Sequence, residues 1–313
     1  MYYNLCDKYL DIIDVINNVD FNNDYLNSLK NNIITKKDLI IKLKKIFIKI
    51  SSRKNIIAKI LLNILLPYDY IISLIFNKHI VDIDNVEIVF DSISELEMLL
   101  SFSNIIKDTN TYTLASSSDE INVVNMVHPL IKNCVSNDYS QRGGVILTGS
   151  NMSGKTTFMR TLGVNQILFN ACKIACADYY FAPNLQVFTS LRAQDELSEG
   201  VSTFYAEILR MKLINEKIQD NKCLILVDEI FKGTNANDRI DASLKVIEKL
   251  NKYNQFFIIS THDFKLCNAI NITNYHFNEE YNNDLISFDY KIKIGKCNSK
   301  NAMYLLKMAK IIE

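Results

Sequence analysis

The feature that most constrains the fold is the placement of glycine. The chain has 313 residues and only eight glycines, all of which lie between Gly143 and Gly295. Three of them fall in the stretch LTGSNMSGKTTFMRTLG, which runs from Leu147 to Gly163. Because glycine loses more backbone entropy on folding than other residues, a cluster in a glycine-poor chain indicates a turn that requires it.

The cluster fits the pattern G-x-x-x-x-G-K-[ST], between a strand predicted at 145–148 and a helix predicted at 156–170. Its glycines let backbone N–H groups face one anion, and the helix N-terminus adds a favourable dipole. We expect Lys155 to reach the β- and γ-phosphates of a nucleotide and the Thr156 hydroxyl to bind Mg²⁺. The predicted phosphate loop comprises Gly149, Ser150, Asn151, Met152, Ser153, Gly154, Lys155 and Thr156.

A second element ends in two acids. The apolar run CLILV is followed by Asp228 and Glu229. An acidic residue at the end of such a strand holds the metal from the far side, so Asp228 is the expected Mg²⁺ partner. Glu229 is expected to accept a proton from the attacking water or to orient it. A buried strand that merely ends in solvated acids is the alternative, and pairing with the phosphate loop disfavours it.

Two more segments complete the pattern. The apolar run FFIIS leads into Thr261 and His262, and His262 is expected to hydrogen-bond the γ-phosphate or the attacking water. The segment DELSEGVSTFYAE lies between the phosphate loop and the acidic strand. Its Ser202 and Thr203 can offer hydroxyl and N–H donors to the nucleotide of a second subunit. A plain capping box is disfavoured because Glu207 is one residue too far from Thr203.

The remaining sequence predicts two regions, an all-α region over 1–113 and an α/β domain over 114–313. The first 142 residues lack glycine, and residues 108–120 are polar and resemble a linker. Helices are predicted at 39–50, 56–66 and 95–105, the last with Ser92 or Ser94 as its N-cap. Later strands are predicted at 145–148, 223–227, 255–260 and 285–294, and helices at 156–170, 203–216, 242–251 and 301–312. Strand–helix alternation predicts a mostly parallel sheet flanked by helices.

Composition restricts the compartment and the partners. Formal net charge is zero, so no global field favours DNA, membranes or acidic partners. Seven scattered cysteines indicate a reducing compartment, and Cys172 and Cys176 lack a second ligand pair for zinc. We expect a cytoplasmic protein with no signal peptide, and leave a nucleus or a viral replication site open.

Two stretches have competing interpretations. Residues 56–76 are apolar but interrupted by Lys59, Pro67 and Asp69, which favours a buried helical pair over a membrane span. Residues 36–54 are rich in lysine interleaved with Ile and Leu. That pattern is more often a solvated helix face than a nucleic-acid surface.

Taken together, these residues resemble the ATPase domain of the MutS family, the DNA mismatch-repair clamps among the ABC-type P-loop ATPases. The likeness rests on TGSNMSGKTTFMRTLG, DELSEGVSTFYAE, LVDEIFKGTN and STHD. VHPLI and VSNDYS resemble the segment near the adenine, and DYKIKIGKCNSKNAMYLLKMAKI resembles the closing strand and the helical tail that contributes to dimer contacts. The resemblance covers 122–313, and 61–95 is more loosely similar to the end of the family's core domain.

The resemblance implies an ATPase that works as a homodimer with two composite ATP sites. Asn151, Gly154, Lys155, Thr156 and Thr157 would hold the phosphates and the metal, Asp228 and Glu229 would handle Mg²⁺ and water, His262 would sense the γ-phosphate, and Ser202 and Thr203 would complete the partner's site. Thr234 would lie at the dimer seam, and Val135 and Asn137 would line the adenine pocket.

The resemblance also implies double-stranded or branched DNA as a partner, in repair or recombination. The first residues show no Phe-x-Glu mismatch reader, so we expect no mismatch-reading domain of the chain's own. A nucleotide-gated protein-interaction module that does not use DNA is the alternative. An SMC-like or transporter-like ABC ATPase is disfavoured, because the sequence has no Leu-Ser-Gly-Gly-Gln stretch and Ser202-Thr203-Phe204 takes its place.

Overall fold

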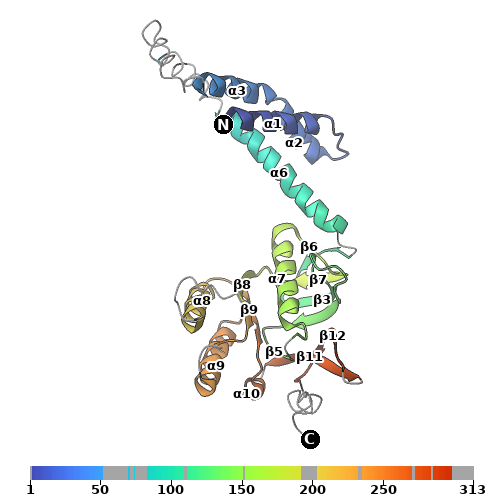
Figure 1. The fold of residues 1–313 in the computed structure, drawn as a ribbon, viewed down its shortest axis with the longest axis vertical. Coiled ribbons are helices and arrows are strands. Elements are labelled where there is room, and N and C mark those ends of the chain that lie inside the picture. The colour runs from blue at the N-terminus through green and yellow to red at the C-terminus, as the bar shows by residue number, and fades with distance from the viewer. Residues whose placement is uncertain are drawn as a thin grey trace. The chain divides into compact units, whose positions relative to one another are not determined.

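The computed structural model describes residues 2–51, 70, 74, 83–108, 111–150, 152–191, 203–231, 235–269, 272–282 and 285–297 (Figure 1). Contacts divide the chain into two units, Met1–Asn104 and Ile105–Glu313. The identity of the predicted regions 1–113 and 114–313 as a helical stalk and an ATPase domain stays a prediction.

The first unit contains helices α1 (Tyr2–Asn17), α2 (Asp24–Ile34), α3 (Lys37–Ser51) and most of α6 (Ile83–Asp108). Ion pairs Lys37–Asp14 and Lys44–Asp7 join α3 to α1. The apolar faces of these helices share one core, made of Cys6, Ile13, Leu29, Ile33, Ile40, Val89, Ile93 and Leu96. Burial of these stripes, rather than helix propensity alone, holds such helices together.

The predicted helix 39–50 is confirmed within α3, and 95–105 is confirmed within α6. The N-cap prediction is wrong, since α6 begins at Ile83 and both Ser92 and Ser94 lie inside it. Val89 and Ile93 enter the core, so tertiary packing carries the helix through its polar residues. The predicted helix 56–66 lies outside the described residues.

The second unit is built on a six-stranded sheet in the order β12-β11-β5-β10-β9-β8. Its strands are β5 (Gly144–Thr148), β8 (Gln186–Ser190), β9 (Cys223–Asp228), β10 (Phe256–Ser260), β11 (Thr273–Asn282) and β12 (Leu285–Ile294). All neighbours pair in parallel except β11 and β12, which form an antiparallel pair. The mostly parallel sheet predicted from the sequence is confirmed; β8 and β11 were not predicted.

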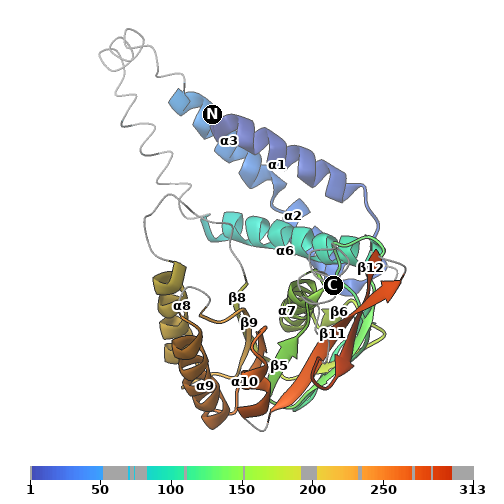
Figure 2. The same cartoon turned by 60° about the horizontal axis from the view of Figure 1, so that its bottom comes forward.

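Helices cover both faces of this sheet. Helix α7 (Lys155–Cys172) lies on one face, and α8 (Thr203–Lys217), α9 (Ala236–Lys252) and α10 (Phe264–Ala269) lie on the other (Figures 1 and 2). The central strands are therefore apolar along their whole length: Leu224 and Leu226 belong to the cluster that contains α7, whereas Ile225 and Val227 belong to the cluster that contains α8 and α9. This two-sided burial is what a parallel strand requires.

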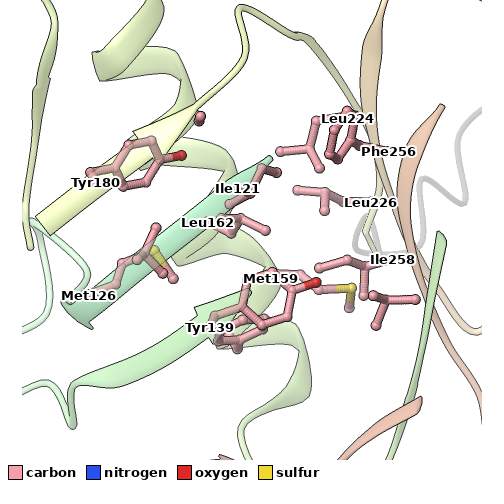
Figure 3. Close-up of a cluster of buried hydrophobic side chains, with 14 of the residues drawn as sticks. Ile121, Met126, Tyr139, Met159, Leu162, Tyr180, Leu224, Leu226, Phe256 and Ile258 are labelled. Atoms are coloured by element: carbon pink, nitrogen blue, oxygen red, sulfur yellow. The ribbon is translucent and has the colours of Figure 1, made fainter. Parts of the chain in front are cut away.

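A second sheet, which the sequence did not predict, packs on the far side of α7. Its order is β2-β7-β3-β4, with β2 (Ser116–Ser117), β7 (Tyr179–Ala182), β3 (Ile121–Met126) and β4 (Asn137–Gln141). Figure 3 shows Ile121, Met126, Tyr139 and Tyr180 gathered with Leu162 of α7. Helix α7 is thus buried between two sheets, and its position is fixed from both sides.

The interpretation of residues 108–120 as a linker is wrong for part of that stretch. It contains β2 and also β1 (Thr113–Leu114), which pairs with β6 (Ile174–Ala175). The Ala115 N–H donates to the Lys173 carbonyl at 2.8 Å. Pairing with residues far away in the sequence produces no local sequence pattern. The polar composition of 108–120 therefore wrongly indicated a linker. Among the described residues, no helix combines the length and apolar character needed to cross a membrane.

The start of β5 gives a direct test of this packing. A Cβ on Gly144 would lie 2.1 Å from Cζ of Phe257, a fully buried ring. Gly144→Ala should therefore lower the free energy of unfolding by about 1–3 kcal/mol through overpacking. Chemical denaturation measures the change. Adding Phe257→Leu should recover part of the lost free energy of unfolding, because the smaller side chain leaves room for the new Cβ. If the effects of the two substitutions are strictly additive, the proposed clash is wrong.

Candidate functional site

The site lies where three parallel strands end side by side. Strand β10 lies between β5 and β9, and its last residue Ser260 is in register with Leu147 of β5 and Asp228 of β9. The polar segments that follow these strands therefore meet at one edge of the sheet. In open α/β sheets this carboxyl edge is where ligands bind.

The loop after β5, predicted to bind phosphate, has a tightly turned backbone. Gly149 and Gly154 have φ of 146° and 108°, and Met152 between them has φ of 71°. A Cβ on Gly149 would lie 2.9 Å from Ser153 Oγ and 3.0 Å from the Phe277 carbonyl oxygen, so the turn has no space for a side chain. Gly154 is the N-cap residue of α7, which directs the helix N-terminus at the loop. Asn151 lies outside the described residues.

Lys155 is buried within this loop. Its Nζ donates to the carbonyl oxygens of Gly149 at 2.8 Å and Ser150 at 2.7 Å. These bonds hold the ammonium group against the turn that the sequence predicts to surround the phosphates. Its contact with β- and γ-phosphates stays a prediction.

The predicted metal ligands are adjacent. Thr156 Oγ1 donates to Asp228 Oδ2 at 2.6 Å, and Ser260 Oγ donates to the other carboxylate oxygen of Asp228. Hydroxyl and carboxylate oxygens are the hard ligands that Mg²⁺ prefers, so this donor set fits the ion. The structure brings together both residues that the sequence assigned to the metal.

Glu229 and His262 form the third part of the site. His262 Nε2 lies 3.2 Å from Glu229 Oε1, with Glu229 largely buried and His262 about half exposed. Glu229 has φ of 56°, in the left-handed region that costs a non-glycine residue of order 1–3 kcal/mol. Strain of this kind persists only where neighbouring bonds enforce it, and the Glu229 N–H is bonded to the hydroxyl and the carbonyl oxygen of Ser260.

The loop that carries His262 is anchored to α9. Arg239 Nε and Nη2 lie 2.9 and 2.8 Å from Asp263 Oδ2, and the Asp263 N–H donates to Thr261 Oγ1 at 3.0 Å. This ion pair was not foreseen, because α9 begins at Ala236 rather than at the predicted residue 242. Its polar first turn, capped by Asn235, has no apolar periodicity to reveal it.

A cavity of about 310 Å³ opens beside the phosphate loop. Val135 and Asn137, the predicted adenine neighbours, line it together with Gly154 and Thr157. Tyr290 of β12 and Phe277 of β11 also line it. Neither was predicted, because no sequence motif marks the residues of a β-hairpin that line a cavity. The assignment of the base to this cavity stays a prediction.

Asn137 has a second role at the cavity. Its Nδ2 donates to the carbonyl oxygens of Tyr290 at 3.0 Å and Val135 at 3.3 Å, and its Oδ1 accepts the Ile292 N–H at 2.7 Å. The amide therefore ties β4 to the backbone of β12.

The segment predicted to act in trans is only partly described. Thr203 begins α8 as predicted, whereas Ser202 and the loop before it lie outside the described residues. Thr234 and the predicted helix 301–312 lie outside them as well. The roles of these residues in a dimer stay predictions.

Comparisons with known proteins agree with the motifs. The chain is 32% identical over 238 residues to MutS protein homolog 4 of Mus musculus. The aligned segment covers 70% of this chain and 24% of that protein. It is 31% identical over 203 residues to the DNA mismatch repair protein MutS of Petrotoga mobilis, covering 62% and 23% of the two chains. Against the Bacillus subtilis protein of the same name the identity is 28% over 235 residues, covering 70% and 27%.

The chain thus spans about a quarter of the length of these curated relatives. Residues 145–313, more than half of the chain, match the family model for MutS domain V. This match includes the phosphate loop, the acidic strand end and the His262 loop that meet at the carboxyl edge of the sheet. The chain belongs to the MutS domain V family.

Proposed function

We propose that this chain hydrolyses ATP at a site shared between two copies and couples that hydrolysis to binding of double-stranded or branched DNA. The observation that carries the proposal is the continuous set of contacts from Thr156 through Asp228 to Glu229 and His262. It joins the predicted phosphate loop to the Glu229 carboxylate, which we assign as the proton acceptor. The DNA part rests on the relatives named for DNA mismatch repair.

Each residue has a defined task in this proposal. The N–H groups of the loop and Lys155 bind the phosphates, and Thr156 and Asp228 hold Mg²⁺. When bound, Mg²⁺ would neutralise charge on the phosphate oxygens. Glu229 orients the attacking water and accepts its proton, while His262 hydrogen-bonds Glu229 and the γ-phosphate side of the site. Little covalent chemistry is needed from the protein, since positioning and charge neutralisation supply most of the rate.

Trans completion explains the segment before α8. Ser202 directly precedes α8 in the sequence and Thr203 begins that helix, and their hydroxyl and N–H groups are donors that a second copy's γ-phosphate could accept. The site's own side of that phosphate already has Lys155 and His262. A closed dimer would therefore form only with nucleotide bound, which links ATP to subunit closure.

Glu229→Gln should retain ATP binding and lose turnover by about 10²–10⁴-fold, because the amide cannot accept the proton. Phosphate release measures turnover, and a fluorescent ATP analogue measures affinity. Glu248→Gln, an exposed position on α9, is the matched control and should behave as wild type. Hydrolysis by Glu229→Gln at the wild-type rate would remove Glu229 from its role.

Complementation tests the shared site. A Ser202→Ala, Thr203→Ala variant and a Lys155→Ala variant should each be inactive alone. Their mixture should recover about a quarter of wild-type turnover, since random pairing makes about half of the dimers mixed and each mixed dimer has one intact site. No recovery, with mixed dimers shown by differently tagged subunits, would place the Ser202 loop in cis, whereas wild-type activity of the Ser202→Ala, Thr203→Ala variant alone would remove the loop from the site.

DNA binding separates the two candidate functions. A DNA-acting ATPase should bind duplex or branched DNA with a binding constant whose logarithm falls linearly with the logarithm of salt concentration, because phosphate contacts release counterions. Fluorescence anisotropy over a salt series measures this, and polyglutamate serves as the polyanion control for ATPase stimulation. Binding and ATPase rates that do not respond to DNA would support the nucleotide-gated protein-interaction module instead.

A further inference from the structure

Ser260 lies at the centre of the site, and no role was predicted for it from the sequence. It is the last residue of β10, is fully buried, and stands in register between Leu147 and Asp228. The Thr261 N–H that follows donates to the Leu147 carbonyl at 3.0 Å, so the backbone at this point is fixed to β5. The Ser260 hydroxyl is therefore attached to a backbone that is held firmly in place.

The Ser260 hydroxyl makes two bonds of opposite sense. It donates to one oxygen of the Asp228 carboxylate, and it accepts the Glu229 N–H at 3.1 Å. The Ser260 carbonyl oxygen also accepts that N–H, at 3.2 Å. Since Thr156 Oγ1 donates to the other carboxylate oxygen at 2.6 Å, hydroxyl groups on two elements fix the rotation of the Asp228 carboxylate.

The same bonds act on the strained residue. Glu229 has a left-handed backbone, which a side chain normally disfavours, and its N–H is the group that Ser260 holds twice. Loss of the hydroxyl would leave this N–H with the Ser260 carbonyl oxygen alone and would let the backbone relax toward an unstrained conformation. Its carboxylate would then leave the position 3.2 Å from His262 Nε2.

We propose that Ser260 is a positioning residue that sets the Asp228 carboxylate and the Glu229 backbone relative to the Thr156 hydroxyl. This inference rests on the proposed ATP hydrolysis and adds a residue to it. Only a short side chain with both an O–H donor and lone pairs serves both neighbours. Alanine has neither, cysteine keeps the size with a weak donor and acceptor, and threonine keeps the hydroxyl.

The experiment compares Ser260→Ala, Ser260→Cys and Ser260→Thr with wild type. Turnover at saturating ATP should fall between about tenfold and a hundredfold in the alanine and cysteine variants, while KM for ATP changes less than about twofold. Threonine should restore most of the rate, since its hydroxyl can make the same bonds. Ser243→Ala is the matched control, because Ser243 is buried and its hydroxyl bonds only the Arg239 carbonyl among the described contacts.

A binding measurement gives a readout independent of turnover. Affinity for the fluorescent ATP analogue in EDTA should match wild type in all variants, because the phosphate loop is intact. The gain in affinity on adding Mg²⁺ should shrink in the alanine and cysteine variants and return with threonine. Thermal melts check that each variant is folded, and cysteine covers the case in which alanine or threonine is not.

The outcomes separate the two ideas. A turnover rate and an Mg²⁺ response equal to those of wild type in folded Ser260→Ala or Ser260→Cys would overturn the role of Ser260. The proposed function would still stand. Loss of EDTA affinity together with turnover would also overturn it, since the effect would then be on the loop. Wild-type protein that neither binds nor hydrolyses ATP would overturn the proposed function and this inference with it.

Discussion

The structure depends on burying β9 and β10 on both faces. These strands carry apolar side chains on both sides, so α7 must cover one face and α8 and α9 the other. Once the layers are in place, parallel pairing in fixed register brings the ends of β5, β10 and β9 to one edge. The polar residues after those strands meet because the apolar residues before them cannot shift.

Confinement of α7 between two sheets has a similar effect on the phosphate loop. Met159 and Leu162 of this helix are fully buried, so its N-terminus cannot move without disturbing the cores on both sides (Figure 3). The strained backbone of Met152 and of Glu229 is tolerated beside this rigid frame. The free energy gained by packing the core therefore maintains unfavourable backbone conformations at residues of the predicted site.

Sequence alone predicted what is local. The phosphate loop is specified by residue type and spacing within eight positions, and the buried strands by unbroken apolar runs. Strands β3 and β7 were not predicted because they are short: β3 mixes apolar residues with asparagine, and the four residues of β7 alternate in burial but not in polarity. The contacts of Ser260 could not be predicted either, because its partner Asp228 is 32 positions away and only strand register brings them together.

The hydrogen bonds of Asn137 bear on how the proposed nucleotide site would select a base. Both of its hydrogens and its oxygen are engaged by backbone groups, two of them on the β11–β12 hairpin. An amide committed in this way has no hydrogen left with which to read the edge of a base. In the proposed site, discrimination among purines would rest on the other polar lining groups, such as Asn133 and Thr157, and on the shape of walls such as Tyr290 and Phe277. Ring walls select by size and stacking, so the proposed site would exclude an enlarged ring system.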